Sequence, residues 1–162
     1  MISVLFVCLG NICRSPMAEA IFRDLVQKEG LQDQITIDSA GTGDWHIGHP
    51  PHEGTRKILK KNQVTDEGLV ARQIATDDLN QFDYIIAMDS QNIDNIRKVG
   101  KIAEHVKINK LLDYVESAKG KDVPDPYYTG NFDEVYELVQ AGCTRLLEEI
   151  KKELSLKGKM DE

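Results

Sequence analysis

The first segment constrains the possible folds of this chain most strongly, because residues Ile2–Cys8 are apolar at nearly every position. A strand of this kind must be covered on both faces, which is typical of a strand inside a parallel sheet. A short polar loop follows, and then a helix start, where Ser15 suits the N-cap and Pro16 the first helical position. We expect this helix to end at Gly30. The strand–loop–helix unit predicts an α/β fold.

The rest of the chain repeats this alternation of strands and helices. The other expected strands are apolar runs over residues 35–39, 82–88 and, more weakly, 104–108. The other expected helices cover residues 51–61, 89–99 and a segment from 131 onward. The alternation favours a three-layer fold, with a parallel sheet and helices on both faces. We expect a single domain over residues 1–154 and a frayed tail over residues 155–162, where apolar residues are few.

Composition limits the classes of partner that this protein can bind and the cellular compartment in which we expect it. The 162 residues carry a formal net charge of −7, which argues against nucleic acid, because a phosphate backbone needs a basic surface. An anionic substrate would therefore need a local positive pocket. The apolar run over residues 4–9 is too short to span a bilayer, so we expect no membrane partner. Three cysteines, an odd number, do not suggest a disulfide scaffold and favour the reducing cytoplasm.

The loop over residues 8–16 has the composition of an anion-binding site. Cys8 is followed, after five residues, by Arg14. A loop that curls into a helix N-terminus points several N–H groups at one spot, and Gly10 and Asn11 tolerate the left-handed backbone that the curl needs. Arg14 matches phosphate oxygens in pairs, and its charge, with a hydrogen bond from Ser15, favours a thiolate at Cys8. The alternative is a buried structural cysteine beside a surface arginine, which this strand–loop–helix context makes the poorer interpretation.

A second loop offers a general acid. Asp125 lies in a segment with two prolines, Pro124 and Pro126, which stiffen it. Tyr127 and Tyr128 follow and are suited to stacking on an aromatic substrate. A carboxyl group near the nucleophile is needed to protonate a leaving oxygen. An ordinary Asp-Pro turn is the alternative.

Five motifs in order resemble those of the low-molecular-weight protein tyrosine phosphatases. They lie at residues 4–20, 38–42, 71–73, 82–89 and 125–128. The resemblance covers roughly residues 2–153, and its first and last motifs are the most specific. It implies a four-stranded parallel sheet and phosphotyrosine-containing proteins as substrates. It also implies that no metal or other cofactor is needed.

The resemblance implies a two-step mechanism. Cys8 would attack phosphorus and form a phosphocysteine, while Arg14 and the loop amides hold the phosphate oxygens. Asp125 would protonate the leaving phenolate and then activate the water that hydrolyses the intermediate.

Further site residues are implied by the same resemblance. Those expected to bind substrate are Leu9, Gly10, Asn11, Ile12, Cys13, Ser15, Trp45, Tyr127 and Tyr128. Those expected to support the loop are Asn11, Ser15 and Ser39. The sequence departs from the family in one place: many members carry a histidine shortly before Ala71, where it supports the phosphate loop, and this chain has Glu67-Gly68-Leu69-Val70 there.

Several other residues allow two interpretations. Three histidines, His46, His49 and His52, suggest a metal site, but no convincing further ligand accompanies them. Cys143 lies on the last helix and is expected to be a core residue. Cys13 is expected to form a reversible disulfide with Cys8 after oxidation, and the alternative is that it only packs the loop.

Three other activities fit parts of the pattern. Thioredoxin-coupled arsenate reductases share the fold and loop, but need a relay of two further cysteines, and no cysteine lies between Cys13 and Cys143. A phosphoarginine phosphatase is the second alternative, although an apolar Ile12 suits a flat phenyl ring better than a guanidinium group. The third is a non-catalytic phosphoprotein-binding module, which needs neither nucleophile nor acid. We expect a monomer, with weak self-association as the alternative.

Overall fold

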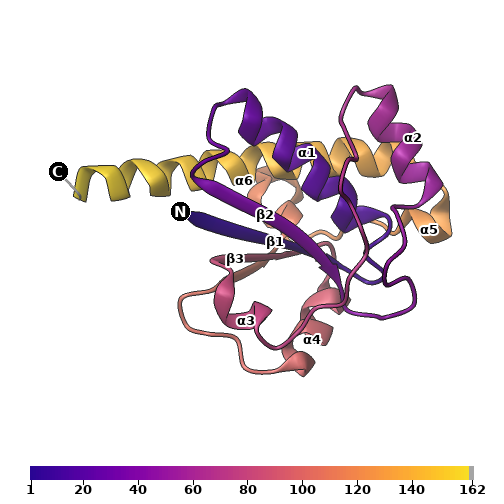
Figure 1. The fold of residues 1–162 in the computed structure, drawn as a ribbon, viewed down its shortest axis with the longest axis horizontal. Helices are drawn as coiled ribbons and strands as arrows, with labels where there is room; N and C mark the ends of the chain where they lie inside the picture. Colours follow the sequence, from indigo (N-terminus) through magenta and orange to yellow (C-terminus); the bar gives the residue numbers. More distant parts are fainter. Residues whose placement is uncertain (161–162) are drawn as a thin grey trace.

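The computed structural model describes residues 1–160. At its centre lies one parallel sheet of four strands in the order β2-β1-β3-β4 (Figure 1). The strands are β1 (Ile2–Cys8), β2 (Ile35–Gly41), β3 (Tyr84–Ala87) and β4 (Lys107–Lys110). The predicted four-stranded α/β fold is therefore confirmed.

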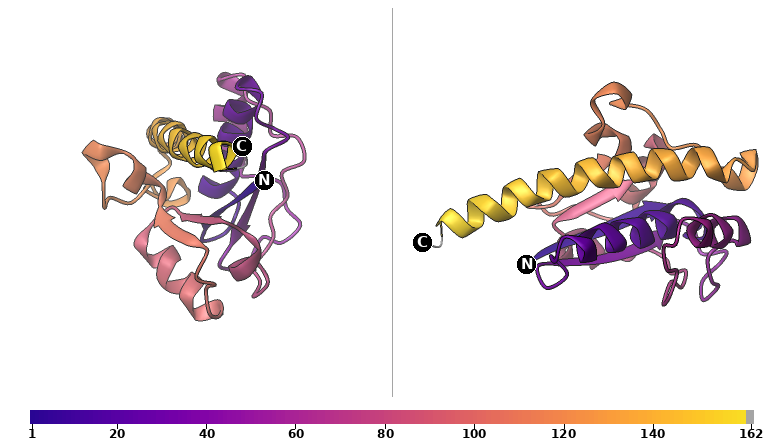
Figure 2. Two further views of the ribbon diagram at one scale, coloured as in Figure 1. Left: turned by 90° about the vertical axis from the view of Figure 1, so that its left-hand side faces the viewer. Right: turned by 90° about the horizontal axis from the view of Figure 1, so that it is seen from above.

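Helices cover both faces of the sheet and make three layers (Figure 1). The helices on one face are α1 (Arg14–Lys28), α2 (Glu53–Lys61) and α6 (Phe132–Met160). Those on the other face are α3 (Asp78–Gln81) and α4 (Ser90–Val99). The connection between β4 and α6 contains two 3₁₀ turns, η1 (Leu111–Tyr114) and η2 (Glu116–Ala118), and the short helix α5 (Pro126–Thr129). Helix α6 runs beside α1 and continues beyond the end of the sheet where β1 begins (Figure 2). No helix within residues 1–160 has the length and apolar character needed to cross a membrane.

The side chains of strand β1 explain why helices must pack on both faces of the sheet. Its alternate side chains Val4 and Phe6 are fully buried in the core under α1 and α6, where Phe6 meets the ring of Phe22 edge to face. Leu5 and Val7 are buried in the second core, on the face that carries α3 and α4. The apolar run therefore reflects burial on both faces, as in the interior of parallel sheets.

Three strands differ from their predicted bounds. Strand β2 continues to Gly41 rather than ending at residue 39. Strand β3 covers Tyr84–Ala87 rather than residues 82–88. Asp83, just before it, still donates its backbone N–H to Ser3 O at 3.0 Å, and its side chain accepts from Ser3 N at 2.9 Å. Strand β4 covers Lys107–Lys110 rather than residues 104–108. Residues 104 and 105 form a turn, and Val106 packs into the second core.

Helix boundaries also differ in places. Helix α2 begins at Glu53, two residues later than predicted, because the ring of His52 caps it by accepting from Gly54 N at 2.9 Å. Helix α6 continues to Met160, whereas a frayed tail was predicted from residue 155. Residues 155–158 are exposed, so the helix's own hydrogen bonds, rather than core packing, carry this extension. The last two residues of the predicted tail, 161 and 162, lie outside the described residues, and a domain boundary at 154 stays a prediction.

Candidate active site

The loop between β1 and α1 begins at the carboxyl edge of the sheet, where Cys8 pairs with Gly41. Asn11 takes the left-handed backbone with φ of 57°, as this curled loop requires. Helix α1 begins at Arg14, and Ser15 is not its N-cap, so that prediction is wrong. The Oγ of Ser15 lies instead 2.9 Å from the Sγ of Cys8, and the N–H of Asn11 donates to the same sulfur at 3.3 Å.

Asn11 joins several polar side chains behind Cys8. Its Nδ2 donates to the Oγ of Ser15 at 2.7 Å and to the Oγ of Ser39 at 3.0 Å. Ser39 in turn donates to the Oε1 of Glu19 at 2.6 Å. A hydroxyl has one proton, and Ser15 already accepts from Asn11, so its proton is free to point at Cys8. Glu19 was not expected from the sequence, because nothing in its position on α1 indicates that Ser39 reaches it.

The segment 67–70, in which the histidine implied by the resemblance is missing, contains one buried residue. Leu69 is buried in the main core. The Oδ1 of Asn11 accepts instead from the backbone N–H of Arg72, at 3.0 Å. The guanidinium group of Arg72 forms ion pairs with Asp38 and Asp78, which hold this backbone segment against the loop. A backbone donor therefore supports Asn11 in this chain.

Arg14 is buried with 2% of its side chain exposed, and its two terminal nitrogens have acceptors. Nη1 donates to Asp89 Oδ2 at 2.6 Å and to Val123 O at 3.0 Å, and Nη2 donates to Asp125 Oδ2 at 3.3 Å. The buried Nε has no partner within residues 1–160 and Nη2 has a single one, so two of the five N–H groups remain for a ligand. Burial disfavours the charge, but attraction to Cys8 and the hydrogen bond to Asp89 outweigh it and raise the pKa of Arg14 above its ordinary value.

Asp89 stands at the start of the helix predicted over residues 89–99, and no role in the site was predicted for it. It caps α4, accepting from Asn92 N at 2.8 Å, and its second oxygen binds Arg14. The signal for this second contact was its position directly after β3, at the same edge of the sheet as Cys8.

Asp125 is brought to the loop, which the sequence alone did not establish. It caps the short helix α5, where its Oδ1 accepts from Tyr127 N at 3.1 Å, and its Oδ2 faces Arg14. Tyr127 and Tyr128 follow as exposed side chains whose rings meet edge to face at 5.4 Å. One acid and two aromatic rings therefore stand at the mouth of the loop.

A cavity of about 320 Å³ opens above Cys8. The residues that line it are Cys8, Leu9, Gly10, Ile12, Cys13, Trp45, His46, Asp125, Tyr127 and Tyr128. Asn11 and Ser15, also predicted to bind substrate, are not among them and lie buried behind Cys8. His46 was not predicted to line this cavity. Its ring lies close to Gly10, where an added Cβ would stand 3.1 Å from the ring.

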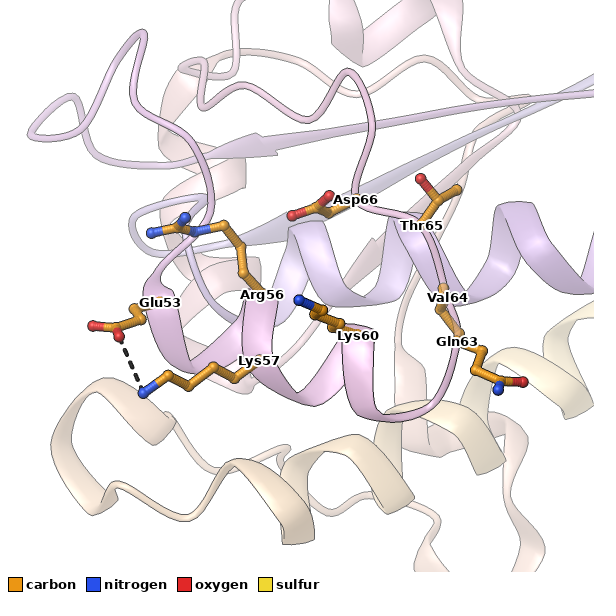
Figure 3. Close-up of a pocket in the computed structure, with 8 residues that line it drawn as sticks. All are labelled: Glu53, Arg56, Lys57, Lys60, Gln63, Val64, Thr65 and Asp66. Carbon is orange, nitrogen blue, oxygen red and sulfur yellow. Dashed lines mark ion pairs between the residues drawn. The ribbon is translucent and has the colours of Figure 1, made fainter.

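A larger hollow of about 620 Å³ lies between α2 and residues 63–66 (Figure 3). Basic side chains Arg56, Lys57 and Lys60 line it together with Glu53, which pairs with Lys57 at 3.0 Å, and Asp66. It contains no nucleophile and none of the predicted site residues. The cavity above Cys8 is therefore the candidate active site.

The three histidines belong to an aromatic cluster at the rim. His52 stacks on Phe132 at 5.3 Å between ring centroids and meets Tyr127 at 6.0 Å, while His46 and His49 are 6.0 Å apart. Within residues 1–160 no three side chains of metal-ligating type converge.

The other two cysteines differ from Cys8 in their surroundings. Cys13 is 3% exposed, and burial, then the nearby Cys8, raises its pKa to about 12. Cys143 is fully buried in the main core, where its Sγ lies 3.7 Å from Ala18 O, and burial raises its pKa as well. The prediction of Cys143 as a core residue is confirmed, and the three thiols are free.

Comparison with known proteins assigns the family. Residues 3–156 match the family described as low molecular weight phosphotyrosine protein phosphatase. The Bacillus subtilis (strain 168) protein named low molecular weight protein-tyrosine-phosphatase YfkJ is 59% identical over 156 residues, which are 96% of this chain and all of the relative. PtpA of Staphylococcus epidermidis (strain RP62A) is 50% identical over 157 residues, covering 97% of this chain and 99% of the relative.

Comparison with solved structures supports the same family assignment. The crystal structure of YfkJ superposes with a TM-score of 0.91, covering 94% of this chain and 96% of that one. A structure described as DARP, drosophila arginine phosphatase, is 35% identical with a TM-score of 0.81, covering 91% and 97%. The parallel fold, with its cysteine–arginine loop at the sheet edge, is that of a protein-tyrosine phosphatase. The chain belongs to the low-molecular-weight protein-tyrosine phosphatase family.

Proposed function

We propose that this enzyme hydrolyses phosphotyrosine in proteins through a phosphocysteine on Cys8. One observation carries the proposal: the sulfur of Cys8 lines a cavity that Asp125 also lines, and the buried Arg14 contacts that same Asp125. Nucleophile, anion-binding group and acid therefore surround one space.

In the first step the thiolate lone pair of Cys8 attacks phosphorus. The bond between phosphorus and the phenolic oxygen breaks, and that oxygen takes the proton of Asp125. Arg14 and the N–H groups of the loop hold the other phosphate oxygens. The unpartnered Nε of Arg14 supports this role, because a buried donor without an acceptor is costly unless a ligand supplies one.

In the second step Asp125, now a carboxylate, takes a proton from water. The water oxygen attacks phosphorus, the S–P bond breaks, and the thiolate returns with inorganic phosphate as product. The thiolate is stabilised by the proton of Ser15, the N–H of Asn11 and the N-terminus of α1.

The cavity walls favour phosphotyrosine. Ile12, Trp45 and Tyr127 form apolar surfaces on which a phenyl ring can pack while its phosphate reaches Cys8. The short side chain of phosphoserine would have to draw the peptide backbone into the same space. The curated relatives YfkJ and PtpA carry names that refer to tyrosine phosphatase activity.

Phosphoarginine is the second candidate, because one similar structure is described as an arginine phosphatase. The apolar Ile12 argues against it, since a guanidinium group needs acceptors for its N–H groups. An arsenate reductase would need a relay of further cysteines, and a binding module would need no acid such as Asp125.

Cys13 is proposed as the partner of Cys8 under oxidation. Peroxide would oxidise the thiolate of Cys8 to a sulfenic acid. The sulfur of Cys13 would then attack that sulfur, forming the S–S bond and releasing water. Both cysteines line the same cavity, which supports the pairing. Because the pKa of Cys13 is raised, its thiolate fraction is small and this step is expected to be slow.

The cellular setting is part of the proposal. Three free thiols are suited to the reducing cytoplasm. We expect a monomer, or weak self-association, that needs no cofactor and does not bind nucleic acid.

The test is turnover on phosphotyrosine, phosphoserine and phosphoarginine peptides of otherwise identical sequence, with and without vanadate. Fast release of phosphate from the phosphotyrosine peptide alone, blocked by vanadate, is expected. Faster release from the phosphoarginine peptide would overturn the proposed specificity.

A further inference from the structure

A cluster of polar contacts fastens the segment that precedes Asp125. At its centre is Lys110, the last residue of β4, whose side chain is only 12% exposed. Its Nζ donates to Gly120 O at 2.6 Å, to Asp122 Oδ1 at 2.9 Å and to Ser90 Oγ at 3.0 Å. All three donors of the ammonium group are therefore used.

The residues around the Lys110 ammonium group are held in place by further hydrogen bonds. Asp122 Oδ1 also accepts from the N–H of Ser90, the first residue of α4, at 3.1 Å. Asp113 accepts from Gly120 N at 3.0 Å and from Lys110 N at 3.1 Å. The segment 120–122 is thus tied to the ends of β3 and β4, at the edge of the sheet that carries the active site.

Two residues, Val123 and Pro124, connect this cluster to Asp125. Val123 N donates to Met88 O at 2.8 Å, and Val123 O accepts from Arg14 at 3.0 Å. Pro124 follows and fixes its own φ. Little freedom therefore remains between Asp122 and the acid.

We propose that Lys110, with Asp122, is a positioning residue for Asp125. Without the ammonium group, Gly120 O and Asp122 lose their shared donor, and the segment before Val123 gains freedom. An acid displaced by about 1 Å protonates its leaving group much less efficiently. The inference rests on the proposed role of Asp125 and adds residues that touch neither substrate nor phosphate.

The side chain of Lys110 differs from that of an ordinary surface lysine, because it is 12% exposed and has three acceptors, while its partner Asp122 is 52% exposed. Exposed pairs contribute little, because solvent screens them and both side chains are mobile. Lys107, at the other end of β4, is a more exposed residue: its side chain is 54% exposed, pairs with Glu153 at 3.3 Å and donates to the hydroxyl of Tyr84 at 3.3 Å. It therefore provides a matched control on the same strand.

The experiment compares Lys110→Met, Asp122→Asn, Asp125→Ala and Lys107→Met with the parent across aryl phosphates of increasing leaving-group pKa. For Lys110→Met and Asp122→Asn we expect kcat to fall about tenfold with the poorest leaving groups and little with the best. KM and vanadate affinity should not change, because the loop of Cys8 and Arg14 is intact. Lys107→Met should match the parent throughout.

Three results separate the possibilities. An equal loss across the series in Lys110→Met, or no loss, overturns the positioning role when Asp125→Ala still shows a steep dependence. A flat response of Asp125→Ala overturns the role of Asp125 itself and this proposal with it. Adding Lys110→Met to Asp125→Ala should lower kcat no further, and a further loss would contradict the proposal.

Discussion

The hydroxyl of Ser15 has one proton and two close neighbours, Asn11 and Cys8. Asn11 donates its own amide proton to Ser15, which leaves the hydroxyl proton for the sulfur. At the level of single residues, the site thus combines donors aimed at Cys8 with a carboxyl group, Asp125, facing the buried Arg14.

Asp125→Ala should lower kcat by about a hundredfold or more for aryl phosphates with poor leaving groups. The loss should shrink as the leaving group becomes more acidic, because a stable phenolate needs no proton. Steady-state kinetics over a leaving-group series measures this, and an equal loss along the series would assign Asp125 another role.

Cys13→Ser should lose the ability to recover from oxidation. In the parent, peroxide treatment followed by dithiothreitol should restore most activity, because the disulfide protects Cys8 from further oxidation. The variant should stay inactive. Equal recovery in both proteins would show that Cys13 does not protect Cys8.

Residue spacing was enough to predict Cys8 and Arg14 as candidates, whereas Asp125 was predicted from its proline-containing loop and the family resemblance. The structure brings the three together. It was not enough for Asp89, because its contact with Arg14 joins residues 75 positions apart and depends on which strands are neighbours. Glu19 was missed for the same reason.

The end of strand β2 packs directly against the backbone of the phosphate loop that follows Cys8. A Cβ added at Gly41 would stand 2.9 Å from Leu9 O and 3.0 Å from Asn11 N, both backbone atoms. Gly41 cannot yield, because its N–H donates to Arg72 O and its carbonyl accepts from Ile74 N, both at 2.8 Å. The loop would have to move instead.

Gly41→Ala should therefore lower kcat/KM by about a hundredfold and destabilise the fold by about 1–3 kcal/mol. Gly158→Ala is the control, since nothing lies within 4 Å of its added Cβ. Kinetics and denaturant unfolding of both variants test this. Parent-like activity of Gly41→Ala would mean that the loop does not depend on this close approach.

Periodicity predicted the strands and long helices well, because each buries an apolar face that the sequence displays. It failed at β4, because Lys107–Lys110 contain a single apolar residue, Ile108, and the strand is stabilised by pairing with β3. It also failed to predict α5, a single turn capped by Asp125. Such short elements depend on contacts made after the chain has folded.

For the whole molecule, stability should depend on the charge of Glu19. Burial raises its pKa above the ordinary value of 4.5, while the hydrogen bond from Ser39 opposes this. The folded state therefore holds this proton at pH values where the unfolded chain has released it. Its contribution to stability falls as pH rises from about 4.5 through the folded-state pKa.

Glu19→Gln should remove this loss of stability at high pH, because the amide oxygen of glutamine still accepts from Ser39 and the side chain carries no charge. We expect the variant to unfold at higher denaturant than the parent at pH 7 and to show a smaller decline in stability as the pH rises above about 4.5. Denaturant titrations at several pH values measure this. A variant less stable than the parent at pH 7 would contradict the account of Glu19.

The most direct test of the account is to trap the covalent intermediate. Asp125→Ala is expected to slow hydrolysis of the proposed phosphoenzyme. Rapid acid quenching after mixing with an aryl phosphate of low leaving-group pKa, followed by peptide mass spectrometry, should then find one phosphoryl group on Cys8. Cys8→Ser should show none and should have no turnover, while still binding phosphate. A phosphoryl group on any other residue, or one that accumulates in Cys8→Ser, would contradict the assignment of Cys8 as the nucleophile.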